Sequence, residues 1–424
     1  MKNVIPAINH KLKGTITIPA DKSISHRAIM FASLADGKSI IRNCSNAKDP
    51  NSTLSVCCAL GVDIQKADDN TIIVYSNSKF QPIGETFDCG NSGTTMRLMC
   101  GILSGQPFNS TLVGDESLSK RPMKRVIEPL SLMGAKISAV NNCAPIQINA
   151  GKLAGITYSS KISSAQVKSC MLLAGLHAEG ETVYTEPYLS RNHTELMLKY
   201  MNADIEFDGV LTKIRPSVLE PREIDVVGDI SSAAFFMVAA SIIPGADIVI
   251  KNVGLNPTRT GILEVLNTMG GNVEILDENV VSGELVGDIR VRYSDLKACT
   301  IEGEIIPKLI DELPVIAVLA TQAEGITIIK DAEDLRNKET DRISAIVSEL
   351  KKVGADITAT EDGFIINGKT SLTGGVEVDT YHDHRLAMSL YVAGLICKKE
   401  ILIRDFEWVD ISFPEFENLM SYLL

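Results

Sequence analysis

The spacing of apolar residues predicts a repeated structural unit along this chain. An apolar helical run ends near a glycine and leads into a short apolar strand, and this arrangement occurs six times. The closing glycines of the first five copies follow one another at intervals of about 70 residues. The six helical runs span residues 28–37, 98–105, 170–180, 233–245, 314–325 and 386–396.

A second helix and strand alternate with the first. Helices end in small-residue turns that lead directly into strands at residues 60–64, 133–137, 201–205, 269–273 and 353–357. The last helix, residues 413–424, would be the sixth copy, and we expect the opening segment Ile5–Ile18 to supply its strand. The predicted unit is therefore β-α-β-α-β-β. Chance similarity of helix–strand units explains two or three copies, but not six in the same alternation.

Six units divide most simply into two lobes of three units each. A natural break lies near residues 220–228, and a return crossing is expected near Lys13. We therefore predict an α/β fold with a first lobe at residues 20–226. The second lobe would combine residues 1–19 with residues 227–424. The length of 424 residues supports two domains, because single hydrophobic cores rarely grow so large.

Composition and charge narrow the class of protein. The chain is 45% hydrophobic and 5% aromatic, as in ordinary soluble α/β proteins, and its formal net charge is −12. An acidic chain is poorly suited to bind nucleic acid or an anionic membrane, so we expect neither partner. The nine cysteines show no C-x-x-C spacing, which favours reduced thiols, and no apolar run has signal or membrane-spanning length. We expect a cytoplasmic protein.

Two loops have the features of anion sites at helix N-termini. In Asp88–Arg97, two glycines are followed by hydroxyl residues and then by an apolar run. Such a glycine-bent loop directs free backbone N–H groups and the positive end of a helix dipole toward one point. Pro19–Arg27 follows the same logic and adds two cations and two hydroxyl groups at the start of another helix.

Basic residues recur near the N-terminal ends of the predicted helices. Lysine and arginine normally favour helix C-termini, and a bound anion would remove the conflict. For one residue alone, a solvated surface charge is the commoner explanation, but the repetition favours a site. We expect these helix ends to face one cleft that binds two small, highly charged anions. The basic residues are Lys22, Arg27, Arg97, Arg121, Lys168, Lys338, Arg342 and Arg385.

Two further motifs match known ligand sites but have better explanations. Gly37–Ser39 resembles the end of a phosphate-binding loop, but a helix precedes it where that motif requires a strand. His382 and His384 flank Asp383, and a polar cap at a helix start explains them better than a metal site, because no further ligand cluster is visible. We therefore predict no metal site.

Two carboxylates stand beside the cations. Asp311 precedes an apolar helix, where it is either an N-cap or a general base that neighbouring cations keep ionised. Glu339 lies between Lys338 and Arg342, where it is either part of a surface ion pair on a helix or a proton donor or acceptor for a carbon centre. The residue pattern leaves both alternatives open.

Five long motifs, in order along essentially the whole chain, resemble those of the 5-enolpyruvylshikimate-3-phosphate synthase family. They are Pro19–Arg27, Gly90–Arg97, Lys120–Met123, Lys338–Arg342 and Asp383–Met388. The resemblance implies two lobes of three β-α-β-α-β-β units each, joined by two crossovers and closing over the substrates.

The resemblance also implies an activity. Members of this family transfer the enolpyruvyl group of phosphoenolpyruvate to the 5-hydroxyl of shikimate 3-phosphate and release phosphate, a step of aromatic amino-acid biosynthesis that uses no metal or organic cofactor. The first lobe would mainly hold shikimate 3-phosphate. The second lobe would carry the catalytic carboxylates and the arginines for phosphoenolpyruvate. We expect a monomer whose partners are these two small substrates.

Matching the motifs residue by residue assigns roles to single side chains. Asp311 would take the proton of the 5-hydroxyl, Glu339 would protonate the methylene carbon, and Lys22 would contact both substrates. The residues expected to bind shikimate 3-phosphate are Lys22, Ser23, Arg27, Ser164, Ala165, Gln166, Arg191, Asp311 and Lys338. Those expected to bind phosphoenolpyruvate are Lys22, Gly93, Arg121, Gln166, Arg342 and Arg385.

The chain departs from the family pattern at three positions. Ala165 stands where some members have a second serine, and Leu98 where some have proline. Ile411 stands where some members have a lysine that contacts phosphoenolpyruvate. The side chains that make one phosphate contact and one phosphoenolpyruvate contact in those members are therefore absent from this chain.

Two alternatives share the fold. UDP-N-acetylglucosamine enolpyruvyl transferases are expected to have asparagine after the first lysine and a cysteine near residues 111–121, whereas this chain has Ser23 and no cysteine in residues 114–119. A catalytically inactive anion-binding relative is the other alternative. The presence of Lys22, Asp311, Glu339 and Arg342 argues against it, because an inactive copy needs neither carboxylate.

Overall fold

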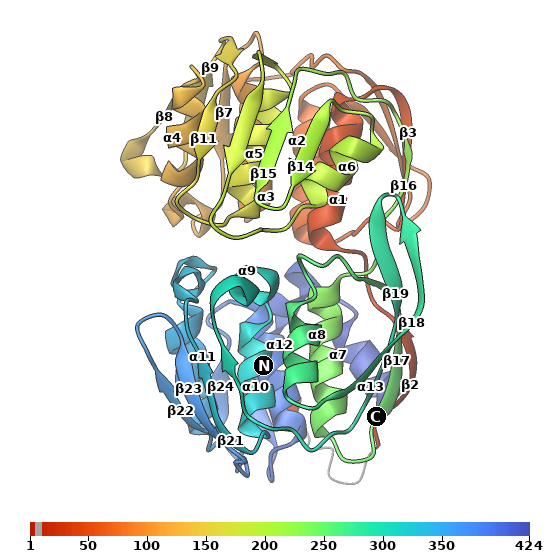
Figure 1. Cartoon of the computed structure of the whole chain (residues 1–424), viewed down its shortest axis with the longest axis vertical. Helices are drawn as coiled ribbons and strands as arrows, with labels where there is room; N and C mark the ends of the chain where they lie inside the picture. Colours follow the sequence, from red (N-terminus) through yellow and green to blue (C-terminus); the bar gives the residue numbers. More distant parts are fainter. Residues whose placement is uncertain (5–10) are drawn as a thin grey trace. The chain divides into compact units, whose positions relative to one another are not determined.

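The structure, a computed structural model, describes residues 1–4 and 11–424 and contains two compact units (Figure 1). Unit A comprises Ala20–Val227 and Val280–Glu284, and unit B comprises Met1–Pro19, Gly228–Asn279 and Leu285–Leu424. Residues 280–284 fall inside the range expected for the second lobe but belong to unit A. The reason is local, because the Ser282 hydroxyl accepts a hydrogen bond from the Asp225 N–H in that unit.

Unit A contains three β-α-β-α-β-β repeats. The first consists of β16 (Glu223–Asp225), α1 (Lys22–Leu34), β3 (Asp36–Arg42), α2 (Lys48–Ala59), β4 (Asp63–Lys66) and β5 (Ile72–Asn77). The second consists of β6 (Thr86–Asp88), α3 (Gly93–Ser104), β7 (Ser110–Val113), η1 (Leu118–Lys120), α4 (Lys124–Leu132), β8 (Lys136–Ala139), η2 (Val140–Asn142) and β9 (Ile146–Asn149). The third consists of β11 (Thr157–Ser159), α5 (Ala165–Gly175), β13 (Thr182–Thr185), α6 (His193–Tyr200), β14 (Ile205–Asp208) and β15 (Leu211–Ile214). The short strands β10 (Leu153–Ala154) and β12 (Ala178–Glu179) form a separate parallel pair.

Unit B contains the other three repeats. The fourth consists of β2 (Lys13–Thr17), α7 (Ile230–Ile242), β17 (Asp247–Gly254), α8 (Gly261–Thr268), β18 (Asn272–Val281) and β19 (Glu284–Arg292). The fifth consists of β20 (Thr300–Ile301), η3 (Gly303–Ile305), α9 (Ile306–Leu309), α10 (Leu313–Thr321), β21 (Gly325–Ile329), η4 (Glu333–Asn337), α11 (Arg342–Lys352), β22 (Asp356–Ala359) and β23 (Phe364–Gly368). The sixth consists of β24 (Glu377–Asp379), α12 (His384–Leu395), β25 (Ile401–Arg404), η5 (Phe406–Ile411), α13 (Phe416–Leu423) and β1 (Lys2–Val4).

Each repeat forms a small mixed sheet with the same strand order. The first strand pairs in parallel with the second, and in the five sheets with four described strands the fourth strand lies between the second and the third. In the second repeat, Phe87 pairs with Leu112 in parallel, and Leu112 pairs with Ile146 in an antiparallel ladder. A parallel pair requires a crossover, and in the second, third, fifth and sixth repeats the first helix of the repeat supplies it. That helix therefore begins just beyond the carboxyl end of a strand, where open α/β sheets bind ligands.

Three repeats take a strand from a distant part of the sequence. β16 pairs in parallel with β3 through Ile224 and Ile41, and closes the first repeat after the rest of unit A has been traversed. β2 pairs in parallel with β17 and opens the fourth repeat. β1 runs antiparallel to β25 and takes the fourth-strand position in the sixth sheet, which has three strands among the described residues.

The prediction that Ile5–Ile18 completes the sixth repeat is wrong for the described part of that segment. β2 lies within it but belongs to the fourth repeat, and the sixth repeat takes β1 instead. Residues 5–10 lie outside the described residues. The error has a physical cause, because both strands pair with partners more than two hundred residues away and no local pattern specifies such pairing.

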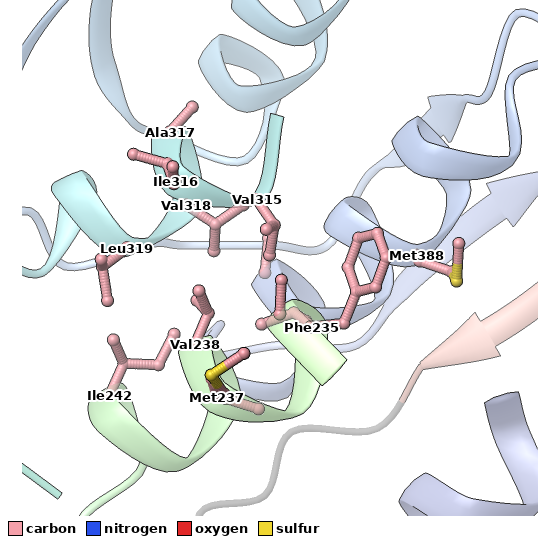
Figure 2. Close-up of a cluster of buried hydrophobic side chains, with 14 of the residues drawn as sticks. Phe235, Met237, Val238, Ile242, Val315, Ile316, Ala317, Val318, Leu319 and Met388 are labelled. Atoms are coloured by element: carbon pink, nitrogen blue, oxygen red, sulfur yellow. The ribbon is translucent and has the colours of Figure 1, made fainter. Parts of the chain in front are cut away.

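Apolar helices form the core of each unit. In unit B every residue of α7, α10 and α12 is buried, as expected for helices that are hydrophobic on all sides. Figure 2 shows Val238 and Ile242 of α7 pointing toward Val318 and Leu319 of α10. No helix within the described residues has both the length and the apolar character needed to cross a membrane.

In unit A, the backbones of α3 and α5 come into direct contact at Gly101. A Cβ atom added to Gly101 of α3 would lie 2.2 Å from the carbonyl oxygen of Cys170 of α5. Only glycine permits so close an approach, since real Cβ atoms do not come within 3 Å of other backbone atoms. The distance between α3 and α5 is thus fixed by one missing side chain.

A chain of hydrogen bonds joins the N-terminal parts of α1, α2 and α3. His26 Nδ1 lies 2.6 Å from Thr53 Oγ1, and Thr53 Oγ1 lies 2.7 Å from Thr95 Oγ1. Thr95 Oγ1 in turn donates to Ser92 Oγ at 2.8 Å. Burial lowers the pKa of His26 to about 3, so the ring is neutral near pH 7. The chain therefore fixes three helices without a buried charge.

We expect Gly101→Ala to destabilise unit A, because the new methyl group overlaps the Cys170 carbonyl and forces α3 and α5 apart. Overpacking of this kind costs about 1–3 kcal/mol or more of the free energy of unfolding, measurable by urea denaturation. Gly84→Ala is the matched control, because no atom lies within 4 Å of its added Cβ. Equal stability of the two variants would contradict the close packing.

The buried, neutral His26 predicts a loss of stability in acid. Unfolded histidine titrates near pH ~6.5, whereas the folded pKa is about 3, so between these values the unfolded state binds one more proton. The stabilisation from His26 is complete above pH ~6.5 and falls by about 1.4 kcal/mol per pH unit below it. The difference in free energy of unfolding between wild type and His26→Gln should therefore shrink by about 2 kcal/mol from pH 7 to pH 5. A difference that stays constant with pH would refute this.

Candidate functional site

Unit A gathers polar side chains at the N-termini of α1, α3 and α5. Asp21 caps α1 by accepting from the Ile24 N–H, and Ser92 caps α3 by accepting from the Thr95 N–H. Ser164 takes the N-cap position of α5 but makes no side-chain cap bond. Its hydroxyl group is therefore not engaged in capping its own helix.

Lys22 is the first residue of α1 and pairs with a carboxylate of α2. Its Nζ lies 2.9 Å from Asp49 Oδ2, and both side chains are mostly buried. The helix dipole disfavours an ammonium group at this position, and the carboxylate offsets that cost. The sequence predicted the cation at this helix start but did not identify Asp49 as its partner.

Two arginines lie beside the start of α3 at Gly93. A Cβ atom added to Gly93 would lie 2.8 Å from Arg97 Nη1 and 3.5 Å from Arg121 Nη1. Arg97 donates to Gln166 Oε1 at 2.6 Å, and Gln166 donates to Thr94 Oγ1 at 3.1 Å. The structure thus brings together Gly93, Arg121 and Gln166, three of the residues assigned to phosphoenolpyruvate.

The loop that precedes α3 supplies the hydrogen-bond partner that orients the Arg121 side chain. Its Nη2 donates to Asn91 Oδ1 at 3.0 Å, and Asn91 donates to Asp115 Oδ2 at 2.7 Å. The sequence placed Arg121 at the beginning of a helix, and this is wrong, because Arg121 follows η1 and α4 begins only at Lys124. The guanidinium group nevertheless reaches the start of α3, which is a different helix from the expected one.

Arg27 is buried and joins three helices of unit A. Nε donates to Thr194 Oγ1 of α6 at 2.7 Å, and Nη2 donates to Ser169 Oγ of α5 at 2.8 Å. Nη1 donates to the Ser23 carbonyl at 3.0 Å. Burial lowers the pKa of Arg27 to about 10, which leaves the guanidinium charged near pH 7.

Lys168 is the fourth residue of α5, but its prediction as an anion-binding cation is wrong, because its side chain is buried and paired with two carboxylates. Its side chain is 1% exposed, and Nζ lies 2.8 Å from both Glu186 Oε1 and Glu195 Oε1. The first turn of α5 instead presents Ser164, Ala165 and Gln166. Lys168 points inward because the buried face of α5 packs against the segments that carry the two glutamates.

Unit B is organised around the buried Arg342, the first residue of α11. Nε donates to Asp383 Oδ2 at 2.7 Å, Nη2 to Glu339 Oε2 at 2.6 Å and Nη1 to Asp311 Oδ1 at 3.4 Å. Burial by itself lowers the pKa of Arg342, but Asp383, Glu339 and Asp311 outweigh it and raise this pKa above the ordinary arginine value. One guanidinium therefore holds the two predicted catalytic carboxylates in fixed positions.

The geometry bears on the structural alternatives left open for the two carboxylates. Asp311 is not an N-cap, because Glu312 takes that position of α10 and makes no side-chain cap bond. Glu339 lies in the loop before α11, so it is not part of an ion pair on a helix surface. Lys338 Nζ lies 3.7 Å from Asp311 Oδ1 and 3.1 Å from Asp334 Oδ2. Two cations thus flank Asp311 and favour its charged form.

The start of α12 carries Arg385, the other arginine of unit B that the sequence assigned to phosphoenolpyruvate. Asp383 caps α12 by accepting from the Arg385 and Leu386 N–H groups, and its other oxygen receives Arg342. Arg385 Nη1 lies 4.0 Å from Glu312 Oε1, which also accepts from the Ser231 hydroxyl of α7. The helix starts of α7, α10, α11 and α12 are therefore linked by charged side chains.

The polar cap predicted for this helix start comes from the residue between His382 and His384. Asp383 is the helix cap, and the His382 ring stacks on Trp408 with centroids 4.8 Å apart. No group of three potential metal ligands occurs among residues 1–4 and 11–424. Ile411, at the position where some family members have lysine, ends η5 in the same repeat.

Sequence reasoning missed the groups that hold the cations in place. Only Asp383 had a sequence signal, as part of a predicted helix cap, and its pairing with Arg342 was not predicted. The others are acids and an amide with no distinctive spacing. These residues are Asp49, Asn91, Asp115, Glu312 and Asp383.

Comparison with known proteins identifies the family. The family model described as EPSP synthase (3-phosphoshikimate 1-carboxyvinyltransferase) matches residues 6–420. Proteins named 3-phosphoshikimate 1-carboxyvinyltransferase from Thermodesulfovibrio yellowstonii and Bacillus licheniformis are 52% and 50% identical to this chain over 419 and 409 residues, which cover 97% and 96% of both sequences. The solved EPSP synthase of Acinetobacter baumannii is 42% identical with a TM-score of 0.88, over 99% of this chain and 97% of that one.

A more distant structure shows the fold alone. The enolpyruvyl transferase NikO from Streptomyces tendae is 17% identical, with a TM-score of 0.82 over 99% of this chain and 96% of that one. Together with the six repeats, these matches confirm the predicted two-lobed α/β fold. The matched family model and the relatives at about half identity extend over nearly the whole length, and this chain belongs to the EPSP synthase (3-phosphoshikimate 1-carboxyvinyltransferase) family.

Proposed function

We propose that this protein transfers the enolpyruvyl group of phosphoenolpyruvate to the 5-hydroxyl of shikimate 3-phosphate and releases phosphate. The relatives at about 50% identity carry the name of this activity, and the five motifs that carry the resemblance are present. The observation that carries the proposal is the arrangement around Arg342, which fixes Asp311 and Glu339 beside the same guanidinium group.

The reaction needs two proton transfers, and the two carboxylates suit them. Addition of the 5-hydroxyl to phosphoenolpyruvate requires removal of a proton from oxygen and delivery of a proton to the methylene carbon. Asp311 is flanked by Lys338 and Arg342, which favours its ionised form and thus a role as base toward the hydroxyl. Glu339 serves as the acid toward carbon. In the elimination step, Glu339 takes a proton back from the new methyl group as the bond to phosphate breaks, and Asp311 gives up the proton of the former hydroxyl to the departing phosphate, while the 5-oxygen stays bonded to the enolpyruvyl carbon.

The cations of the site bind and orient two anions. Fixed positive charges offset the repulsion between two phosphorylated substrates, and preorganised donors need no rearrangement during the reaction. In unit A we assign shikimate 3-phosphate to Lys22, Ser23, Arg27, Ser164, Ala165, Gln166 and Arg191. We assign phosphoenolpyruvate to Lys22, Gly93, Arg121 and Gln166 in unit A and to Arg342 and Arg385 in unit B. Asp311 and Lys338 complete the contacts to shikimate 3-phosphate.

The same proposal extends to the location, oligomeric state and cofactor requirement of the enzyme, and to the division of substrate binding between the units. We infer a cytoplasmic monomer that needs no cofactor, with shikimate 3-phosphate held mainly by unit A. The carboxylates and two of the arginines for phosphoenolpyruvate belong to unit B. Sedimentation of the purified protein tests the oligomeric state, and activity after dialysis against a chelator tests whether a metal is required.

Phosphate release from shikimate 3-phosphate and phosphoenolpyruvate tests the activity directly. We expect Asp311→Asn and Glu339→Gln each to lower kcat by about 10²–10⁴, the usual contribution of a positioned acid or base. Asp295→Asn is the control, because Asp295 forms an exposed ion pair with Lys369. Its kcat should equal that of the wild type.

Two results would contradict the proposal. If the wild-type protein releases no phosphate from the two substrates, the activity is rejected, and supplying UDP-N-acetylglucosamine as acceptor distinguishes the related transferase from an inactive relative. If the Asp311 and Glu339 variants retain wild-type kcat, the protein is active but the two carboxylates do not transfer the protons.

Gly93→Ala tests the place assigned to phosphoenolpyruvate. The new methyl group would come 2.8 Å from Arg97 Nη1, so the guanidinium groups at the start of α3 must move by several tenths of an ångström. We expect KM for phosphoenolpyruvate to rise about tenfold, equivalent to ~1.4 kcal/mol, while KM for shikimate 3-phosphate changes less. Gly84→Ala is again the control. An unchanged KM for phosphoenolpyruvate would exclude this position from its binding site.

A further inference from the structure

Lys168 is a buried charged group for which the mechanism above has no role. It lies on α5 one turn after Ser164, and its side chain is 1% exposed. Nζ donates to Glu186 Oε1 at 2.8 Å and to the Ser190 carbonyl at 3.1 Å, and it lies 2.8 Å from Glu195 Oε1. These three acceptors use all three N–H donors of an ammonium group.

The same contacts close a loop before α6. Glu186 Oε1 also accepts from the Ser190 N–H at 2.8 Å and from the Ser190 hydroxyl at 2.9 Å. Residues 186–190 are thereby tied to each other and, through Lys168, to α5. A second tie runs from the Tyr188 N–H to Ser163 Oγ at 2.8 Å, beside the N-cap of α5.

This clamped loop leads directly to residues assigned to shikimate 3-phosphate. Arg191 follows Ser190 in the chain. Thr194, in the first turn of α6, accepts from Arg27 Nε at 2.7 Å and lies 2.6 Å from Ser169 Oγ of α5. Lys168 therefore connects the helix that carries Ser164 and Gln166 with the segments that position Arg191 and Arg27.

The group is poorly suited to a purely stabilising role. Two carboxylates share one ammonium, and the side chains of both are at most 1% exposed. Glu186 Oε2 and Glu195 Oε2 are buried without a hydrogen-bond partner in the part of the chain that the structure describes. Replacing such a buried ion group by apolar residues often leaves stability unchanged or raises it. An apolar replacement cannot, however, reproduce the geometry of the hydrogen bonds that Lys168 and the two glutamates make.

We propose that Lys168 is a positioning residue for the phosphorylated acceptor substrate, acting by fixing the 186–191 segment against α5 so that Arg191 and Arg27 are oriented to bind it. The proposal rests on the proposed function, because it assigns these residues to shikimate 3-phosphate. It adds a side chain that contacts no substrate and acts only through its neighbours.

The test is Lys168→Met, with binding of shikimate 3-phosphate measured by calorimetry and steady-state kinetics measured for both substrates. We expect Kd and KM for shikimate 3-phosphate to rise at least tenfold. KM for phosphoenolpyruvate and kcat at saturation should change less than about threefold. Lys152→Met is the matched control, because Lys152 forms an exposed ion pair with Glu179 in the same unit.

A charge-balanced variant separates positioning from stability. Lys168→Met leaves two buried carboxylates without a cation, which destabilises the fold. The triple variant Lys168→Met/Glu186→Gln/Glu195→Met removes this imbalance, so its Tm should return close to that of the wild type while its Kd for shikimate 3-phosphate stays raised. If the triple variant restores both Tm and Kd, or if neither variant folds, the group is structural and the proposal is overturned.

The outcomes also separate this proposal from the proposed function. A wild-type protein that neither binds shikimate 3-phosphate nor releases phosphate overturns the function. A wild-type protein that does both, together with a Lys168→Met variant of unchanged Kd, overturns only the positioning role. Equal increases in KM for both substrates would also overturn it, because they would indicate a general disturbance of the site.

Discussion

The structure depends on cations placed where the backbone does not favour them. Lys22 opens α1, Arg342 opens α11 and Arg385 lies at the start of α12, so each faces the positive end of a helix dipole. Arg342 is also removed from water, which for an unpaired guanidinium costs several kcal/mol. The carboxylates around these groups offset both costs. They are therefore as necessary for the site as the cations that the sequence displays.

The arginines at the helix starts of the two units have different kinds of hydrogen-bond partner. In unit A, Arg97 and Arg121 donate to the amide oxygens of Gln166 and Asn91, which orient a guanidinium without neutralising its charge. In unit B, Arg342 donates to three carboxylates. An amide partner leaves the positive field available to an anionic ligand, whereas a carboxylate partner can itself accept or deliver a proton. This difference agrees with the division of binding and proton transfer proposed above.

Buried polar groups also determine how the helices of unit A are arranged. The chain from His26 through Thr53 and Thr95 to Ser92 is neutral, so it links helices without the cost of burying a charge. Lys168 with its two glutamates is the charged counterpart, and it specifies the conformation of a loop that apolar packing would leave less defined. Both groups lie close to helix N-termini, where small shifts would change the directions in which the hydrogen-bond donors of the site point.

The sequence by itself determined the repeat, the fold and the family. Apolar helices that alternate with short strands can be recognised locally, and motifs such as Pro19–Arg27 and Lys338–Arg342 are long enough to identify relatives. It also located most cations near helix starts, because a helix start has its own local signals. Those features depend on neighbours in the chain, so a single sequence contains them.

Only the tertiary structure decided which strand completes which sheet and which way each charged side chain points. β1, β2 and β16 pair with strands far away in the chain, and their short sequences are compatible with several partners. Lys168 faces inward because glutamates of other segments lie there, although its position near a helix start resembles that of Arg97. Burial and charge pairing are set by neighbours that arrive from elsewhere in the fold, which is why local patterns cannot specify them.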